Sequence, residues 1–412
     1  MDDRDLDACL VSAPENIYYL TGLDHQGYFA YQLLVVPLEG DPILITRAME
    51  RAIVHDQVPN VRHVGYSDGV DPLPRPTHRE EDLVLAQPTD EGHVLGLEPW
   101  SASLGVSTAN ANLEPPSVEA AVKATCEAIG EAGLSKAKIG FEQNSSFLTY
   151  RIATGIVRGL SEVVWQDASG LVDAVRIIQS SLELECTRLA ARASDSMMLA
   201  GVAAAGVGVP KRDVMAAVYD ALFRRGGTYP GFVPLVRSTR TLEHEHGTWD
   251  EGRLRHKDVL FIELAGCVRR YHAPTGRLVF IGEASSKARR IHAVCVEATE
   301  HAAERIGPGV LAGDVYRAWQ EVVDRAGLTG YRRHHCGYSV GIGYPPSWSG
   351  GGVPQGLRAD SQLVLRPGMV FHLMSWLLRT GRGDSFLSDT IIVTEIGAEL
   401  LTRSSRELLV RQ

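Results

Sequence analysis

Cysteine is scarce in this sequence, and its spacing matches no common cysteine-based site. The six cysteines of the 412-residue chain lie far apart, and no two form a CxxC pair. Such scattering differs from the ligand spacing of zinc sites and from the dense frameworks of disulfide-stapled domains. We therefore expect reduced thiols that mostly pack in the core. They are Cys9, Cys126, Cys186, Cys267, Cys295 and Cys336.

The sequence also lacks long hydrophobic runs and an excess of basic residues. No apolar run approaches the length of about 18 residues that a membrane-spanning helix needs, and the acidic start MDDRDLDACL has no signal-peptide core. The formal net charge of −9 argues against nucleic acid and anionic membrane as partners. These absences predict a cytoplasmic protein without nucleic acid or membrane as partners.

Length and element pattern predict two domains. The chain of 412 residues exceeds the size of about 250–300 residues at which single cores stop growing. Up to about Asp173, strand-like runs alternate with helical ones, which is typical of an α/β domain with a mixed sheet. The strand-like runs are LLVVPL, DPILIT, HVLGLE and KIGFE, and the helical ones cover residues 118–132 and 147–160. We place the domains at residues 1–173 and 174–412.

The second domain combines amphipathic helices with strands. The segment SLELECTRLAARASDSMMLAG has apolar residues at helical spacing, with Ser180 or Ser181 able to cap it and Glu183 in its first turn. Three further helices, starting at Lys211, Ser285 and Gly313, each end at glycine. Strands such as PLVRST, VLFIELAG, GRLVFIG and TIIVTE separate or follow them.

A single carboxylate interrupts one of these apolar strands. The run DVLFIELAGC predicts a strand, and it contains Glu263. A carboxylate on a buried strand must pair, bind a metal or take a raised pKa. With a raised pKa it can act as a base near neutral pH, and held ionised in a dry site it can act as a nucleophile. The other interpretation is that Glu263 lies at a solvent-exposed end of the strand and forms a salt bridge with Arg269 or Arg270.

Segments rich in ionisable and aromatic residues surround this strand. HEHGTWDEG precedes it and YHAPTGR follows it, and such loops indicate an active-site wall. Farther along, HHCGYSVGIGYPPSW combines glycines with aromatic rings, which suit a delocalised cation but are also explained by core packing. His372, in the apolar run VFHLM, is either a structural residue or a polar contact in the site.

Five separated motifs occur in an order known from one enzyme family. They are PGFVPLV, HGTWDE, FIELAGCVRRYHAPTGRLVFIG, GYSVGIGYPPSW and RPGMVFHLM, and they resemble the ectoine hydrolases of the creatinase, prolidase and methionine-aminopeptidase superfamily. The resemblance implies an α/β (α+β) chain, with a creatinase-like N-terminal mixed-sheet domain and a pita-bread catalytic domain. It also implies a homodimer whose N-terminal residues reach the partner's active site. The candidates for this reach are Asp24, His25, Tyr28 and Tyr31.

The metal-binding positions of related peptidases are altered in this chain. Those peptidases bind two metals with two Asp, one His and two Glu. The resemblance places these positions on Glu263, Pro274, Tyr338, Met374 and Ser388. Proline, methionine and serine do not supply the hard oxygen or imidazole donors that a divalent metal pair requires, and an alignment shifted by one residue would add only Asp389. We therefore expect an enzyme without metal or other cofactor, as creatinase is.

The resemblance implies hydrolysis of a small cyclic amidine, such as ectoine or hydroxyectoine, to an acetylated diamino acid. Glu263 would attack the amidine carbon or activate water, His246 would protonate the departing nitrogen, and Asp250 would orient His246. Arg277 is the candidate for the substrate carboxylate. The other candidate substrate-binding residues are Tyr28, Trp249, Tyr271, His272, Tyr338, Tyr344, Trp348 and His372.

Two departures from the ectoine hydrolases leave the substrate open. Gly276 stands where that family usually has serine, and the loop over residues 349–363 is longer and glycine-rich. Another amidine or guanidino compound of a specialised pathway, handled by a creatinase-like hydrolase or lyase, therefore remains an alternative. An Xaa-Pro dipeptidase-like metallopeptidase and a binding protein without catalysis are the others.

Overall fold

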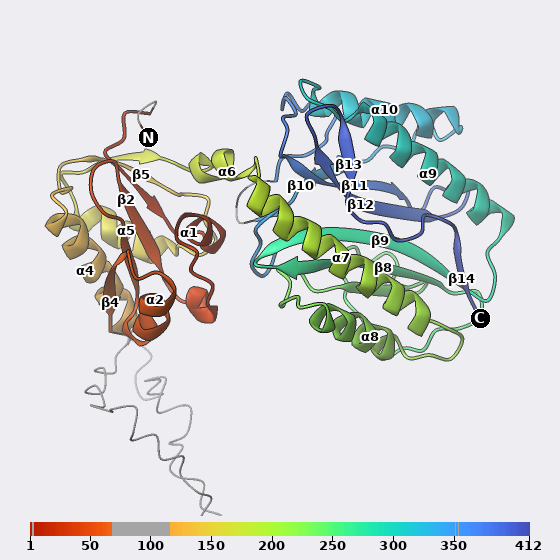
Figure 1. Ribbon diagram of the computed structural model, residues 1–412, viewed down its shortest axis with the longest axis horizontal. Coiled ribbons are helices and arrows are strands. Elements are labelled where there is room, and N and C mark those ends of the chain that lie inside the picture. The colour runs from red at the N-terminus through yellow and green to blue at the C-terminus, as the bar shows by residue number, and fades with distance from the viewer. Residues whose placement is uncertain (2–3, 68–115, 351, 353) are drawn as a thin grey trace, which may run out of the picture. The chain divides into compact units, whose positions relative to one another are not determined.

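The chain forms two compact units, each built on its own β-sheet. The computed structural model describes residues 1, 4–67, 116–350, 352 and 354–412. The units are Met1–Ser169 and Gly170–Gln412 (Figure 1). The expected boundary after residue 173 falls inside the short helix α6 (Leu171–Arg176). The expected strand HVLGLE lies outside the described residues.

The N-terminal unit contains a six-stranded mixed sheet with the order β4-β3-β2-β1-β5-β6. β1 pairs antiparallel with β2 and parallel with β5, so the strands run in both directions, as predicted. The strands are β1 (Ala8–Val11), β2 (Leu33–Pro37), β3 (Ile43–Arg47), β4 (Arg62–Tyr66), β5 (Lys138–Phe141) and β6 (Val164–Asp167). The helices are α1 (Pro14–Thr21), α2 (Arg51–Gln57), α4 (Pro116–Glu131) and α5 (Tyr150–Gly159), with 3₁₀ turns η2 (Gln26–Phe29) and η3 (Ala48–Glu50).

Several N-terminal residues expected to reach a partner subunit instead pack inside this unit. Tyr28 is 7% exposed, and its ring centroid lies 5.9 Å from that of Phe147. The buried Tyr31 hydroxyl lies 2.9 Å from the hydroxyl of Thr125, and His25 is buried as well. In this structure these side chains therefore stabilise their own unit.

The C-terminal unit contains a larger sheet with the strand order β10-β11-β12-β9-β8-β7. Neighbours along this order are antiparallel; β13 adds to β12, and β14 pairs in parallel with β9. The strands are β7 (Leu235–Ser238), β8 (Val259–Val268), β9 (Tyr271–Ile281), β10 (Gly337–Ser339), β11 (Val370–Leu377), β12 (Ser385–Val393), β13 (Ala398–Leu400) and β14 (Leu409–Arg411). β9 and β12 thus form the central seam of the sheet.

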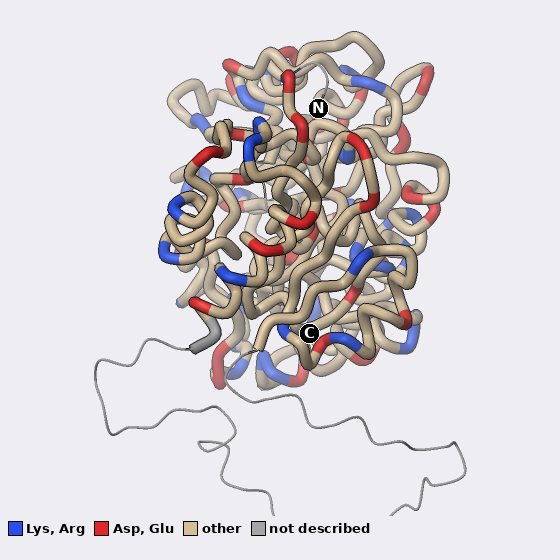
Figure 2. Tube along the Cα trace, turned by 90° about the vertical axis from the view of Figure 1, so that its left-hand side faces the viewer, with Lys and Arg blue, Asp and Glu red and all other residues tan. Residues whose placement is uncertain are grey.

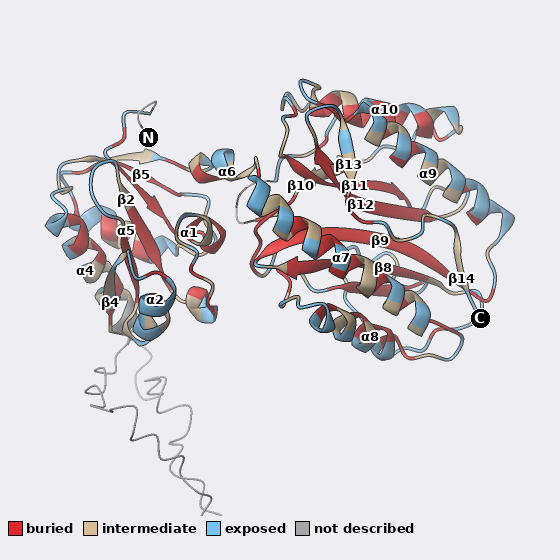
Figure 3. Cartoon of the chain, in the orientation of Figure 1, coloured by how far each residue is buried: buried red, intermediate tan, exposed pale blue. Residues whose placement is uncertain are grey.

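Two helix pairs cover one face of this sheet. α7 (Ser181–Ala204) and α8 (Lys211–Arg224) pack on the half that contains β8, and α9 (Ser286–Arg305) and α10 (Ala312–Arg325) pack on the half that contains β11 and β12. The strands β8, β9, β11 and β12 are buried almost throughout, whereas the helices alternate buried and exposed residues (Figure 3). Two helix pairs on antiparallel strands are the predicted pita-bread arrangement.

Helix α7 fixes the position of β8. Its start is the predicted capping box, in which the Ser180 hydroxyl accepts from the Glu183 amide and the Glu183 carboxylate accepts from the Ser180 amide. Farther along, the Ser194 hydroxyl accepts from the Gly266 amide of β8 at 2.7 Å. A Cβ at Gly266 would clash with the carbonyl oxygen of Ala190, so this glycine allows the helix to approach the strand closely.

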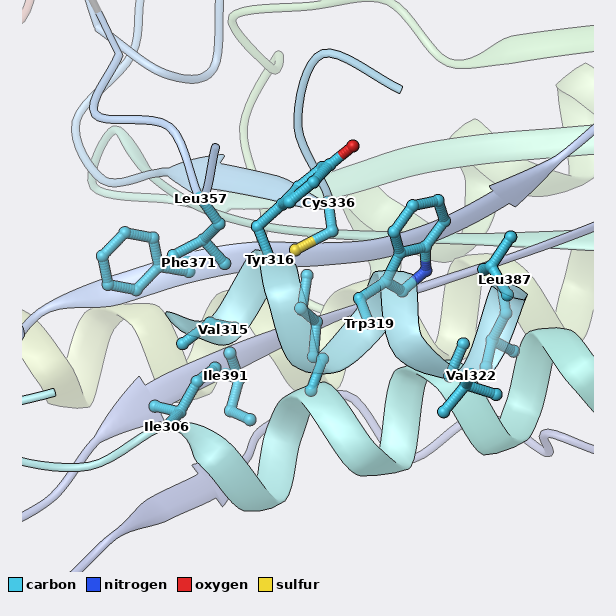
Figure 4. Close-up of a cluster of buried hydrophobic side chains, with 14 of the residues drawn as sticks. Ile306, Val315, Tyr316, Trp319, Val322, Cys336, Leu357, Phe371, Leu387 and Ile391 are labelled. Carbon is cyan, nitrogen blue, oxygen red and sulfur yellow. The ribbon is translucent and has the colours of Figure 1, made fainter. Parts of the chain in front are cut away.

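The second helix pair holds β11 and β12 in the same way. Trp319 of α10 is fully buried among Phe371, Leu387 and Ile391 (Figure 4), and its indole nitrogen donates to the Ser375 hydroxyl at 2.9 Å. Because successive strand residues point to opposite faces, the side chains that alternate with Phe371 and Leu387 face away from the helices. We call this second face, which the helices do not cover and which carries His372, the uncovered face of the sheet.

The two half-sheets meet where β9 pairs with β12. Arg277, opposite Leu387, is fully buried, and its Nη2 lies 2.9 Å from Oδ1 of Asp389. Its other donors bind the Thr275 hydroxyl and backbone carbonyls. These carbonyls belong to Gly276, Ser388, Ser404 and Ser405. No donor of Arg277 is left for a substrate carboxylate, which corrects its predicted role.

Surface charges contribute less to this architecture than packing does. Acidic and basic residues are interspersed along the described trace (Figure 2), and many ion pairs join exposed side chains, as in Arg224 with Asp220. Such pairs contribute roughly 0–1 kcal/mol each. No helix among the described residues is long and apolar enough to cross a membrane.

We expect Arg277→Gln to lower the free energy of unfolding by roughly 3–5 kcal/mol, because it leaves the buried Asp389 carboxylate without one of its cations. Urea unfolding would measure the change. Arg188→Gln is the control, since Arg188 pairs with Glu399 at a partly exposed site and should cost under about 1 kcal/mol. A stable Arg277→Gln variant with a raised KM would restore a substrate role for Arg277.

Candidate active site

Glu263 lies in the middle of β8 and points to the uncovered face of the sheet. Its neighbours Ile262 and Leu264 pack with the helices, so alternation turns Glu263 the other way. The residue is only 6% exposed. Burial raises the pKa of Glu263 to about 7, while the positive charge of Arg237 acts in the opposite direction. The carboxyl group therefore exchanges between its neutral and ionised forms close to neutral pH.

His372 faces Glu263 from the other half-sheet. Its Nε2 lies 3.9 Å from Oε1 of Glu263, and its Nδ1 lies 3.2 Å from the Tyr338 hydroxyl. That hydroxyl accepts from the indole nitrogen of Trp348 at 2.9 Å. Because Trp348 only donates, the Tyr338 hydroxyl can donate to Nδ1, and in that tautomer the proton of neutral His372 lies on Nε2. Burial lowers the pKa of His372 to about 3, so the ring is neutral at pH 7, and its Nε2 faces Glu263.

Further aromatic rings extend from His372, Tyr338 and Trp348 toward the surface. The Phe232 centroid lies 4.9 Å from that of Trp348 and 6.1 Å from that of the exposed His246. On the other side, His335 meets Tyr338 edge-on at 5.4 Å. Glu263 is thus bordered by rings whose faces attract a delocalised cation.

Two anchors flank the segment that carries His246. On one side, Nη1 of Arg237 donates to the carbonyls of Leu242 and His244. On the other, the Asp250 carboxylate lies 2.6 Å from Nζ of Lys211 at the start of α8. Asp250 therefore holds the loop to the helix, which corrects the expectation that it orients the His246 ring. Within the described residues, His246 has a ring contact with Phe232 and no hydrogen bond.

Four other expected site residues have their functional groups engaged elsewhere or exposed. Both ring nitrogens of the buried His272 contact backbone, with Nε2 accepting from the Gly231 amide, and burial lowers its pKa to about 3. The Tyr271 hydroxyl donates to Glu183 of α7. Tyr344 is buried beneath the Arg270 guanidinium, and Trp249 is 38% exposed in the loop. His272, Tyr271 and Tyr344 thus support the walls of the site, which corrects their predicted contacts with substrate.

Buried polar atoms without partners gather on the uncovered face. In the described part of the C-terminal unit, the buried side-chain atoms that lack a hydrogen bond are Nε and Nη2 of Arg237, Nδ1 of His335, Nε2 of His372 and Oγ of Ser388. Native folds rarely leave such atoms unpaired, because each costs roughly 1–3 kcal/mol. Their concentration around Glu263 indicates a site made for a small polar ligand.

The expected metal positions are adjacent in the structure, but they lack metal ligands. Met374 pairs with Ser388, Ser388 with Gly276, and Gly276 with Glu263, so one row crosses four strands. Pro274 lies next to this row. Asp389 points to the helix-covered face. No group of three His, Cys, Asp or Glu placed to hold a metal ion occurs among the described residues, and Glu263 alone does not fit a divalent pair.

Gly276 also has a structural explanation. A Cβ at this position would clash with the ring of Phe386 and approach the Ser388 hydroxyl. Phe386 in turn stacks on Phe261 with centroids 4.6 Å apart. The serine that the resemblance leads one to expect at residue 276 is thus replaced because an aromatic side chain fills the space beside it.

Three residues of the site were not among the predicted ones. Phe232 lies in the motif PGFVPLV, His335 lies two residues before the GYSVG motif, and Arg237 interrupts the apolar strand PLVRST. Arg237 gave the clearest available signal, because a charged residue within an apolar strand needs a partner. Its importance becomes evident only when β7 is placed beside β8, where Leu235 pairs with Glu263.

A mixed-sheet N-terminal unit, followed by a sheet that carries two helix pairs on one face and Glu263 on the other, is the two-domain arrangement of the creatinase and prolidase type. Residues 1–178 match the Creatinase/Prolidase N-terminal domain, and residues 185–395 match Metallopeptidase family M24. The chain belongs to metallopeptidase family M24, which confirms the superfamily inferred from the motifs.

Relatives and solved structures agree with this assignment. Ectoine hydrolase of Halomonas elongata is 27% identical over 421 residues, covering 100% of this chain and 94% of that protein. Uncharacterized hydrolase/peptidase y4tM of Sinorhizobium fredii is 29% identical over 420 residues, covering 100% and 94%. A dipeptidase from Pyrococcus horikoshii shares the fold with a TM-score of 0.76 at 21% identity, covering 99% of this chain and 97% of that one. The protein is a hydrolase of the M24 family.

The raised pKa of Glu263 predicts a pH-dependent stability. The folded state holds the proton up to about pH 7, whereas the unfolded state releases it near pH 4.5. The free energy of unfolding should therefore fall as the pH rises from about 4.5 and level off above about 7, by roughly 3 kcal/mol for a shift of this size. Glu263→Gln removes this contribution. Urea unfolding of both proteins across this range should show an advantage of the Glu263→Gln variant that grows with pH; a constant difference would contradict the assignment.

Proposed function

We propose that this hydrolase opens a small cyclic amidine, such as ectoine or hydroxyectoine, without a metal ion. The proposal rests on one juxtaposition. Glu263, with its pKa raised to about 7, lies beside His372, which meets the Trp348 ring edge-on, on a face where the metal-ligand positions hold Met374 and Ser388. The full-length similarity to an ectoine hydrolase supports the substrate class.

An amidinium is planar, cationic and delocalised. The rings of Trp348, Phe232 and Tyr338 provide faces and edges for such a group, and the ionised Glu263 provides the opposite charge. The N–H of His372 can hold the Glu263 carboxylate or the incoming oxygen. Binding a cation also favours ionisation of Glu263, because an opposite charge nearby lowers the pKa of a carboxyl group.

Hydrolysis adds one water across the amidine carbon–nitrogen bond. Glu263 either attacks the amidine carbon, forming an acyl-type adduct that water then releases, or removes a proton from water as that water attacks. In both routes the departing ring nitrogen gains a proton, for which His246 at the edge of the Phe232 ring is the candidate donor. The product is an acetylated diamino acid.

Incubation with ectoine, hydroxyectoine, creatine and an Xaa-Pro dipeptide, read by mass spectrometry, would test the proposal. We expect ectoine or hydroxyectoine to gain one water, and we expect turnover to persist after exhaustive chelation because Pro274, Met374 and Ser388 offer no carboxylate or imidazole ligand. Turnover of creatine alone would change the substrate class. Dipeptide cleavage that chelation abolishes and manganese or zinc restores would show a metallopeptidase instead.

Glu263→Gln should abolish measurable turnover with the fold intact. Gln keeps the size of the side chain and removes a charge that burial disfavours, so this variant should be at least as stable at neutral pH. His246→Ala should slow turnover by about 10²–10⁴-fold, the usual contribution of a general acid or base. His256→Ala, an exposed histidine beside Gly282, is the control and should leave the rate near wild type. Near-normal kcat in Glu263→Gln would leave Glu263 a purely structural role.

The family resemblance also suggests a cytoplasmic homodimer, and we include this in the proposal. Light scattering of the purified protein would test the dimer. A fully active monomer would contradict the proposed homodimer.

A further inference from the structure

Arg237 is a buried cation on the same sheet face as Glu263. Its guanidinium carbon lies 4.1 Å from the centroid of the Phe261 ring and 5.9 Å from that of Trp376. The residue is fully buried, and the charges that act on it most are those of Glu263 and Glu245. Stacking on aromatic rings offsets part of the cost of burying this charge, but it supplies no hydrogen-bond acceptors for the nitrogens.

The hydrogen bonds of Arg237 use only one of its nitrogens. Nη1 donates to the carbonyls of Leu242 and His244, which hold the segment carrying His246. Nε and Nη2 have no acceptor among the described residues. These two atoms form the side edge of the guanidinium, whose parallel N–H groups match the two oxygens of a carboxylate.

The other large buried arginines of this unit differ in this respect. Arg270 is also fully buried and stacked, with Tyr229 and Tyr344 at 4.2 Å and 4.4 Å, but its nitrogens donate to the carbonyls of Gly343 and Tyr229. Arg277 is fully engaged with Asp389 and backbone carbonyls. Among these three described arginines, Arg237 alone keeps a free bidentate edge.

We propose that Arg237 binds the carboxylate of a zwitterionic substrate through Nε and Nη2. This inference rests on the proposed function and refines it. Glu263 and the aromatic rings receive the cationic end of the molecule, and Arg237, near Glu263 on the adjacent strand, receives the anionic end. The site is thus complementary to a small molecule that carries both charges, and Arg237 takes the role that Arg277 cannot fill.

Binding at Arg237 also affects the His246 segment. The same guanidinium holds the Leu242 and His244 carbonyls and would hold the substrate. Since Arg237 is fully covered, the exposed segment over residues 243–246 must shift for a carboxylate to enter. Arg237 is therefore placed to couple arrival of the anionic group to the position of His246.

The test compares Arg237→Met and Arg237→Lys with the matched control Arg270→Lys. The readout is the ratio of kcat/KM for ectoine to kcat/KM for its methyl ester, which keeps the amidinium and lacks the carboxylate charge. We expect Arg237→Met to lower this ratio roughly 10- to 100-fold, the range of a charged hydrogen bond, and Arg237→Lys to lower it less. Arg270→Lys should leave the ratio unchanged even if it destabilises the fold. Equal loss on both substrates in Arg237→Met would overturn the proposal.

A binding measurement separates this inference from the proposed function. Thermal unfolding of wild type, Arg237→Met, Arg237→Lys and Arg270→Lys is followed with acetate, L-proline or ectoine, each against matched chloride. Stabilisation of wild type and Arg270→Lys that is lost in Arg237→Met supports the carboxylate subsite, even if no amidine is hydrolysed. No difference between wild type and both Arg237 variants with any of these carboxylates overturns it, even if ectoine proves to be the substrate.

Discussion

The other features of the site depend on the burial of one carboxyl group, that of Glu263. In water Glu263 would be ionised at neutral pH, but on an apolar strand its charge is disfavoured, and its pKa rises to about 7. The group is retained there because the surrounding frame cannot relax away from it. α7 lies against β8 at Gly266, and Trp319 holds the opposite half-sheet from behind. A ligand that brings a positive charge to Glu263 therefore interacts with a carboxylate that water does not screen.

The strength of the sequence signals differed among the site residues. Glu263 was identifiable because a lone carboxylate in an apolar strand needs a reason, and Tyr338, Trp348 and His372 lay in motifs with the family's order. Two domains, a mixed N-terminal sheet and the capping box at Ser180 followed from length, periodicity and local chemistry. The resemblance points to Arg277 for the substrate carboxylate and gives no role to Arg237, although both interrupt apolar strands.

The face on which Arg277 lies depends on the register of the β8–β9 hairpin, which the sequence does not reveal. The two residues of its turn, Arg269 and Arg270, both have positive φ, at 47° and 65°. Two-residue turns of this kind favour Asn-Gly or Asp-Gly, so two arginines gave no sign of where the turn falls. A shift by one residue reverses which side chains face the helices. Without the register, Tyr271 and Arg277 could not be placed on the helix-covered face, opposite Glu263.

The seam between β9 and β12 joins the two half-sheets that carry the site. These strands share only the register pairs Leu387 with Arg277 and Ser388 with Gly276, yet Glu263 belongs to one half-sheet and His372 to the other. A molecule held between Glu263 and His372 would contact both half-sheets and so link them across this seam. The ligand, as well as the Arg277–Asp389 pair, would then hold Glu263 and His372 in position relative to each other.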